Sequence, residues 1–119
     1  MTIQFICYPR CTTCAKAQKW LEKSGMVYEV RDIKTHNPSE AELTSWINKS
    51  GLPVRRFFNT SGMQYRAMSL ADRLDDMSDK EKIALLATDG MLVKRPILLA
   101  GGTVLVGFRQ DEWEAALGY

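Results

Sequence analysis

The chain has 119 residues, a formal net charge of +2 and three cysteines. This length predicts one domain over residues 1–119, while the small charge does not indicate nucleic-acid binding and no apolar run approaches the roughly 20 residues of a membrane span. Since Met1-Thr2-Ile3-Gln4 has no basic leader region, we expect a cytoplasmic protein whose cysteines are reactive or metal-binding, without direct contact to nucleic acid or membrane.

The first elements along the chain form a predicted strand-helix-strand unit. Ile3 to Cys7 is an apolar run of strand length, and the amphipathic stretch that follows predicts a helix ending near Ser24-Gly25. A second strand is predicted at Met26 to Arg31. A Cys-x-x-Cys pair at the first junction of such a unit is typical of a thioredoxin-like site.

The two cysteines of this pair, Cys11 and Cys14, are not equivalent. Cys11 lies where the unpaired N–H groups and the dipole of a helix stabilise a thiolate, and Arg10 adds a positive charge beside it. Cys14 shares an inward stripe of the helix with Ala17 and Leu21. We therefore predict that Cys11 attacks and that Cys14 resolves the intermediate by closing an intramolecular disulfide.

The middle of the chain is predicted to be helical but interrupted. A helix begins at Asn37-Pro38-Ser39-Glu40, with Asn37 as its cap, and stops at Gly51. We expect a helical insertion over about residues 54–90, in which Ser78 and Glu81 form a capping box and Gly90 ends the last helix.

The C-terminal part completes an α/β fold. Ile97-Leu98-Leu99 and Val104-Leu105-Val106 flank a Gly-Gly step and predict an antiparallel hairpin, and Gln110 to Leu117 predicts a closing helix. The order of elements predicts a thioredoxin-like fold: a mixed four-stranded sheet with flanking helices and the insertion before the third strand. Pro96, directly before that strand, is a candidate for a cis peptide bond.

The third cysteine, Cys7, is interpreted as a packing residue of the first strand, with a spare thiol as the alternative. The spacing Cys-x3-Cys-x2-Cys can also hold an iron–sulfur cluster, but it joins a strand to a helix here. Zinc would need four ligands, which leaves only His36 to complete the set. We therefore predict no metal and no cofactor.

Several motifs along the chain carry a family resemblance: Pro9-x-Cys11, Asn37-Pro38, Gly51-Leu52-Pro53-Val54-Arg55, Lys94-Arg95-Pro96-Ile97 and Gly107-Phe108-Arg109-x-Asp111-Glu112. Together they resemble the ArsC/Spx branch of the thioredoxin-like superfamily over essentially the whole chain. In the arsenate reductases of that family, a nucleophilic cysteine works with three arginines that hold the arsenate oxyanion through fork-shaped guanidinium donors.

Carried over by position, the resemblance implies Cys11 as the nucleophile and Arg95 and Arg109 as two of the three arginines. Asn59 occupies the third position, and Arg10 adds charge to the predicted anion site. Arg55 or Arg56 is an alternative source of the third guanidinium. Cys7 takes the place of the histidine that lies near the nucleophile in those reductases.

Two functions follow from these observations. The first is an arsenate reductase-like thiol-disulfide oxidoreductase that is regenerated by a thioredoxin or glutaredoxin-type protein or by glutathione. The second is an Spx-like redox regulator that binds RNA polymerase, because Spx proteins have Cys-x-x-Cys whereas these arsenate reductases have one cysteine. The two arginines and the lack of the longer Spx tail favour the enzyme, while Asn59 predicts that arsenate is a poor substrate.

Overall fold

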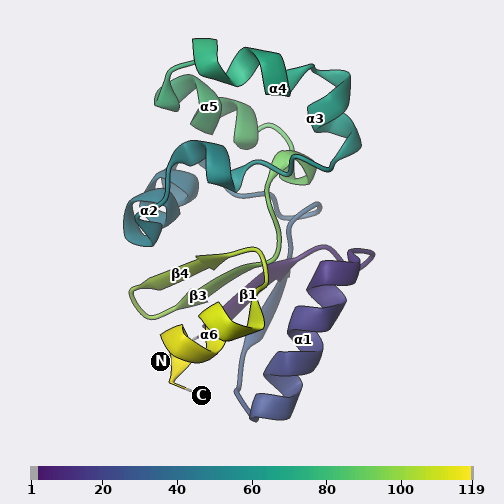
Figure 1. Ribbon diagram of the computed structural model, residues 1–119, viewed down its shortest axis with the longest axis vertical. Helices are drawn as coiled ribbons and strands as arrows, with labels where there is room; N and C mark the ends of the chain where they lie inside the picture. Colours follow the sequence, from purple (N-terminus) through teal and green to yellow (C-terminus); the bar gives the residue numbers. More distant parts are fainter. Residues whose placement is uncertain (1–2, 119) are drawn as a thin grey trace. The chain divides into compact units, whose positions relative to one another are not determined.

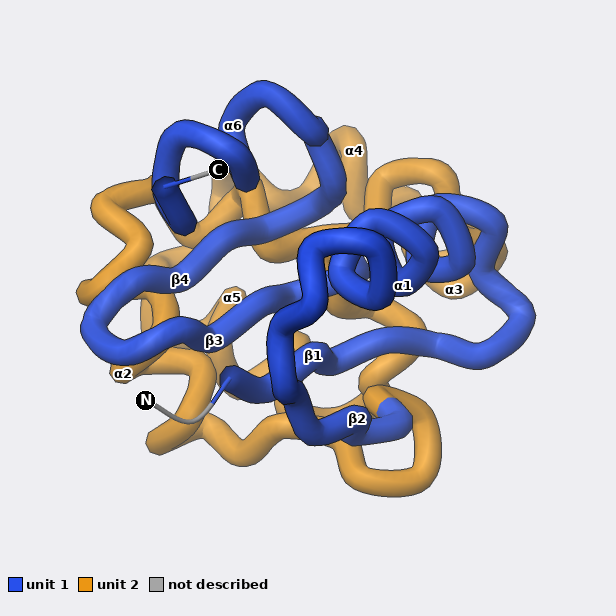
Figure 2. The backbone as a smooth tube through the Cα atoms, turned by 90° about the horizontal axis from the view of Figure 1, so that it is seen from below, with its two compact units in different colours: residues 1–32, 95–119 blue, residues 33–94 orange. Residues whose placement is uncertain are grey.

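The computed structural model describes residues 3–118 and is drawn in Figure 1. Met1, Thr2 and Tyr119, at the ends of the predicted domain, lie outside the described residues. The chain divides into two compact units, which Figure 2 distinguishes by colour. The sheet unit comprises residues 1–32 and 95–119, and the helical unit comprises residues 33–94.

The sheet unit is built on a four-stranded sheet with the strand order β2-β1-β3-β4. Its strands are β1 (Ile3–Cys7), β2 (Glu29–Asp32), β3 (Ile97–Ala100) and β4 (Thr103–Val106). Strand β1 runs parallel to β2 and antiparallel to β3, and β3 pairs antiparallel with β4 as the predicted hairpin. The predicted mixed sheet of a thioredoxin-like fold is therefore confirmed.

The core of the sheet unit joins this sheet to two helices, α1 (Thr12–Ser24) and α6 (Gln110–Leu117). Alternate residues of β1 point to one face of a sheet, and Ile3, Phe5 and Cys7 all enter one cluster. That cluster also contains Cys14 from α1 and Trp113 from α6, so both helices cover the same face of the sheet (Figure 1). This shared core brings two of the three cysteines together.

The largest difference between predicted and observed boundaries in the sheet unit is at β2, whereas β3 and β4 are each one residue longer than predicted. Strand β2 begins at Glu29 rather than Met26, where its pairing with Gln4 of β1 starts. Helix α1 ends at Gly25, whose φ of 77° is a left-handed conformation that suits glycine, as predicted.

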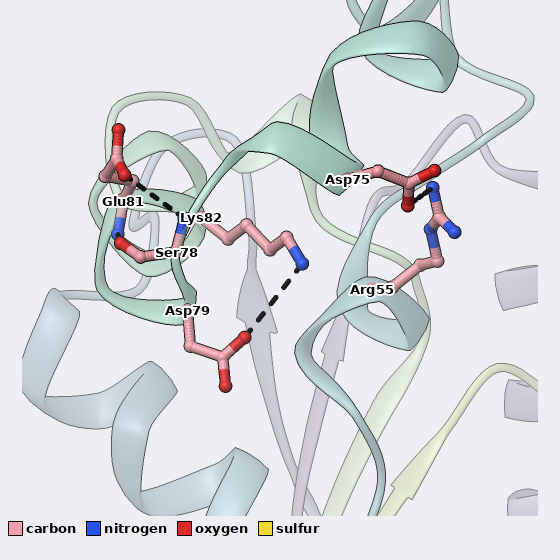
Figure 3. Close-up of polar contacts among 6 residues, drawn as sticks. All are labelled: Arg55, Asp75, Ser78, Asp79, Glu81 and Lys82. Atoms are coloured by element: carbon pink, nitrogen blue, oxygen red, sulfur yellow. Dashed lines mark hydrogen bonds and ion pairs between the residues drawn. The ribbon is translucent and has the colours of Figure 1, made fainter.

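The helical unit contains short elements: α2 (Glu40–Ser50), the 3₁₀ helix η1 (Val54–Phe57), α3 (Met63–Ala67), α4 (Leu70–Arg73), η2 (Leu74–Asp76), α5 (Asp79–Leu86) and η3 (Gly90–Leu92). These elements confirm the interrupted helical character of the middle of the chain. The predicted capping box at the start of α5 is also present: Glu81 N–H donates to Ser78 Oγ, and Ser78 N–H donates to Glu81 Oε1, both at 3.1 Å (Figure 3).

Two predictions in this unit, the residue that caps α2 and the residue that ends α5, were wrong. Helix α2 is capped by Ser39, which exchanges hydrogen bonds with Glu42, and not by Asn37. The Asn37 amide instead donates to the carbonyl of Ala87 at 2.7 Å. Helix α5 ends at Leu86, and Gly90 opens η3, where a Cβ would collide with the carbonyl oxygen of Ile33. This glycine therefore permits a close backbone approach and does not end a helix.

Candidate functional site

A tight turn between β1 and α1 positions the three cysteines. Cys7 is the last residue of β1, and Cys11 is the N-cap of α1 in an extended conformation (φ −87°, ψ 124°). The turn closes because Cys11 N–H donates to the carbonyl of Tyr8 at 2.9 Å. Cys14 then lies in the first turn of the helix, on its buried side. The turn thus joins the last residue of β1 to the N-cap of α1 within four residues.

Cys14 is the central sulfur of this group. It is buried in the same core cluster as Cys7, and Cys11 packs against that cluster. The backbone N–H of Tyr8 also donates to Cys14 Sγ at 3.4 Å. The three cysteines therefore lie together where the strand end and the helix start meet the core.

The hydrogen bond between Cys7 and Cys14 shifts their two pKa values in opposite directions. It is the main reason that the pKa of Cys14 is raised far above its usual value, and burial adds to this effect. It also lowers the pKa of Cys7, against the opposing effects of burial and of the charges on Asp32 and Cys11. A thiol that donates to a neighbouring thiolate keeps its own proton and stabilises that thiolate.

The three cysteines differ in how accessible they are to reagents. The side chains of Cys7 and Cys14 are only 4% and 3% exposed, whereas Cys11 is partly exposed. Arg10, Thr12 and Thr13 around it are exposed residues of the turn and the helix start. Cys11 is therefore the sulfur that a substrate can reach.

Tyr8 connects the cysteine turn to Arg95. The guanidinium carbon of Arg95 lies 5.2 Å from the centroid of the Tyr8 ring, which is a cation–π contact. The Arg95–Pro96 peptide bond is cis, as the sequence suggested, and the carbonyl of Pro96 accepts a hydrogen bond from Gly107 N–H at 2.8 Å. Arg95 thus lies just before the first residue of β3, close to the turn that carries the cysteines.

Two other residues of the predicted anion site, Arg109 and Asn59, belong to different units of the chain. Arg109 is an exposed residue in the sheet unit and is the N-cap of α6, where its carbonyl accepts from Trp113 N–H at 3.0 Å. Asn59 belongs to the helical unit, and its amide lies against Gly62, where an added Cβ would be 2.8 Å from Asn59 Nδ2.

The alternative sources of a third guanidinium also belong to the helical unit. Arg55 forms an ion pair with Asp75 at 3.0 Å (Figure 3), and Arg56 is exposed. Since Arg55 already has a carboxylate partner within its own unit, its use as an anion ligand would require that ion pair to open.

Within residues 3–118, no cluster of three or more histidine, cysteine or acidic side chains has an arrangement that could hold a metal ion. None of the described helices is both long and apolar enough to cross a bilayer.

Sequence reasoning missed two contributions to this site. Tyr8 supplies a backbone donor to Cys14, a backbone acceptor to Cys11 and a ring face to Arg95. Cys7 is buried as predicted, but its thiol is bonded to Cys14 and is more than a packing group. The positions of Cys7 and Cys14 in the sequence could have indicated this interaction. Cys7 is the last inward residue of a strand and Cys14 is the third residue of the next helix, so both enter the same core.

Comparisons with known proteins identify the family of this site. The sequence matches the ArsC family over residues 7–116. A crystal structure of an ArsC family related protein from Bacteroides fragilis has a TM-score of 0.94 and is 50% identical, with 97% of each chain covered. A structure from Streptococcus mutans UA159, described as a possible arsenate reductase, has a TM-score of 0.85 and is 39% identical, with 94% of this chain and 97% of that chain covered.

A curated relative of a different functional class also matches. The global transcriptional regulator Spx of Streptococcus mutans is 28% identical over 109 residues, which cover 92% of this chain and 78% of that protein. The family match over most of the chain decides the assignment. The protein belongs to the ArsC family.

Proposed function

We propose that the protein is a thiol-disulfide oxidoreductase of the arsenate reductase type, with Cys11 as its nucleophile and Cys14 as its resolving thiol. The observation that carries this proposal is that the buried Cys14 lies in the first turn of α1, within the core cluster against which the partly exposed N-cap residue Cys11 packs. A resolving thiol in contact with the nucleophile acts at a high effective concentration. Solved ArsC-related structures with high identity support the same class.

The proposed reaction transfers two electrons to a substrate disulfide. The thiolate of Cys11 attacks one substrate sulfur, a mixed disulfide forms, and the other substrate sulfur leaves as a thiolate. Cys14 then attacks Sγ of Cys11, the Cys11–Cys14 disulfide forms, and the second substrate sulfur leaves with the proton that Cys14 gives up. An external dithiol reductant or glutathione returns the two electrons.

The raised pKa of Cys14 fits the second role better than the first. Because its hydrogen bond to Cys7 and its burial keep this thiol protonated, Cys14 does not compete with Cys11 for the first attack. The same burial limits the access of external reagents to Cys14. The reaction therefore has a fixed order, in which Cys11 reacts before Cys14.

The arginines of the sheet unit suit an oxyanion substrate. Arg95 and Arg109 carry guanidinium groups that bind oxyanions through paired donors, and Arg10 adds charge at the turn. We propose that arsenate is bound weakly, because Asn59 replaces the third arginine of the family pattern. We place the reaction in the cytoplasm with thioredoxin, a glutaredoxin-type protein or glutathione as reductant and without a bound cofactor.

Steady-state turnover tests this function. Arsenate and a small model disulfide are each supplied with NADPH and a regenerating system based on either thioredoxin or glutathione. We expect turnover of the disulfide that Cys11→Ser abolishes, and thioredoxin-supported turnover that Cys14→Ser abolishes. Cys11→Ser turning over at the wild-type rate would exclude Cys11 as the nucleophile.

The similarity to Spx supports a second function, a redox switch in which the same disulfide changes affinity for RNA polymerase. The Cys11–Cys14 pair supports this reading as well, because the switch needs only a reversible disulfide. Binding of purified RNA polymerase by the reduced and the oxidised protein separates the two functions. A large difference in affinity between the two states supports the switch, and undetectable binding by both states contradicts it.

A further inference from the structure

The proposed reaction leaves one thiol of the site without a role. Cys7 is 4% exposed, lies at the end of β1 and is hydrogen-bonded to Cys14. Cys7 and Cys14 both belong to the buried cluster against which Cys11 packs, so Cys14 has two cysteine neighbours. This arrangement places a second potential nucleophile against the sulfur that would be oxidised during turnover.

We propose that Cys7 is a third redox thiol, which exchanges with the Cys11–Cys14 disulfide and moves the oxidising equivalents into a buried Cys7–Cys14 disulfide. This inference rests on the proposed function, because it needs the Cys11–Cys14 disulfide as its starting point. It assigns a chemical role to a residue that the two-cysteine reaction does not use.

The exchange is balanced without an external reagent. The sulfur of Cys7 attacks Sγ of Cys14, a bond between these two atoms forms, and the bond between Cys14 and Cys11 breaks. The electron pair leaves on Cys11, and the proton that Cys7 loses is taken up by the departing Cys11 sulfur. The number of disulfides stays the same, so the protein is neither oxidised nor reduced by this step.

The positions of the three residues favour this direction of exchange. The departing sulfur belongs to Cys11 at the N-cap of α1, where a helix dipole stabilises negative charge. The attacking sulfur belongs to Cys7, which is buried in the same core cluster as Cys14, while the charge on Asp32 of β2 opposes the ionisation of Cys7. A good leaving thiolate speeds thiol-disulfide exchange, and Cys11 supplies it here.

The exchange changes what the oxidised protein presents to solvent. A Cys11–Cys14 disulfide has one partly exposed sulfur, whereas a Cys7–Cys14 disulfide joins two side chains that are 4% and 3% exposed. We call this exchange from Cys11–Cys14 to Cys7–Cys14 the relay. It places the disulfide where reductants have little access, and it returns Cys11 to the free thiol form. Reduction of the stored disulfide then requires the reverse exchange through Cys11.

Mapping of disulfides over time tests the relay. The reduced protein is oxidised with oxidised glutathione, quenched with acid at successive times, alkylated with N-ethylmaleimide and analysed as non-reduced peptides by mass spectrometry. We expect Cys11–Cys14 to appear first and Cys7–Cys14 with alkylated Cys11 to follow. The second species should accumulate as the first declines, while the total amount of intramolecular disulfide stays constant.

Cys7→Ser and Cys7→Ala are the matched controls, and both should hold the Cys11–Cys14 disulfide alone. The decisive species is formed by the wild type itself, so the test does not depend on the folding of either variant. Cys11–Cys14 alone in the wild type at every time, with Cys7 alkylated in every molecule after denaturation, would overturn the relay and leave the proposed function intact. Oxidation that yields no intramolecular disulfide would overturn both.

Discussion

Cys7 and Cys14 share a side-chain hydrogen bond although one ends a strand and the other lies in the first turn of the following helix. The bond follows from the fold, since both side chains enter the core cluster between the sheet and α1. It gives the two thiols opposite tendencies: Cys7 ionises more readily, and Cys14 keeps its proton.

Removal of Cys14 should raise the pKa of Cys7. The hydrogen bond from Cys14 is the main cause that lowers this pKa, while burial and the charge of Asp32 raise it and persist in Cys14→Ala. In a Cys11→Ser background, the Cys7 thiolate should therefore appear at a higher pH when Cys14 is alanine than when it is present. Ultraviolet absorbance of the thiolate during a pH titration measures the change.

Asp32→Asn in the same Cys11→Ser background is the control with the opposite sign. Loss of this negative charge should let the Cys7 thiolate form at a lower pH. Identical titration curves for the Cys11→Ser protein and its Cys14→Ala derivative would mean that the two thiols are not coupled.

Cys11 should be alkylated well before the other two cysteines. It is partly exposed at the N-cap of α1, whereas Cys7 and Cys14 are buried. Limiting iodoacetamide under native conditions should label Cys11 ahead of both in peptide maps, because burial keeps the reagent from Cys7 and Cys14. Preferential labelling of Cys14 or Cys7 under native conditions would contradict the assignment of the nucleophile.

Much of the fold could be predicted because the decisive signals are local. The Gly-Gly step predicted the β3–β4 hairpin, and the pattern Ser78-Asp79-Lys80-Glu81 predicted the start of α5. Cys14, Ala17 and Leu21 were assigned to the buried stripe of α1 from helical spacing alone, and all three are buried. Each of these features depends on residues close together in the sequence.

The predictions that were wrong depend on contacts between distant residues. Asn37 was predicted as the cap of α2 from the local pattern, but in the structure it donates to the carbonyl of Ala87, and Ser39 with Glu42 caps the helix. Gly90 is needed where the backbone approaches Ile33, 57 positions earlier by residue number. The coupling of Cys7 to Cys14 likewise requires the strand and the helix to share a core.

The ring of Tyr8 should contribute to anion binding by holding Arg95. Tyr8 and Arg95 are both partly buried, and a cation–π contact contributes at least about 0.5–1 kcal/mol, so Tyr8→Leu should weaken oxyanion binding by at least roughly two- to fivefold. Tyr8→Phe keeps the ring face and should bind as the wild type does. Protection of Cys11 from iodoacetamide by increasing arsenate measures the affinity. Equal protection in the wild type, Tyr8→Phe and Tyr8→Leu would show that the 5.2 Å contact does not position Arg95 for an anion.

Introduction of the family's third arginine should improve arsenate turnover. A charge-assisted donor contributes about 1.5–3 kcal/mol, which corresponds to roughly a tenfold to hundredfold gain in oxyanion affinity for Asn59→Arg. Asn59→Lys is the control, because a lysine adds the charge without the paired donors. Efficient arsenate turnover by the wild type, with no gain in Asn59→Arg, would mean that another group completes the site.

The central claim is that Cys14 captures an adduct on Cys11 within the same molecule. The most direct measurement is mass spectrometry of the protein after reaction with oxidised glutathione, compared between the wild type and Cys14→Ser. The wild type should lose glutathione and carry an intramolecular disulfide that includes Cys14, because the thiol in contact with Cys11 outcompetes dilute external thiols. Cys14→Ser should retain glutathione on Cys11. Glutathione that persists on Cys11 of the wild type, or a Cys7–Cys11 disulfide, would contradict the account.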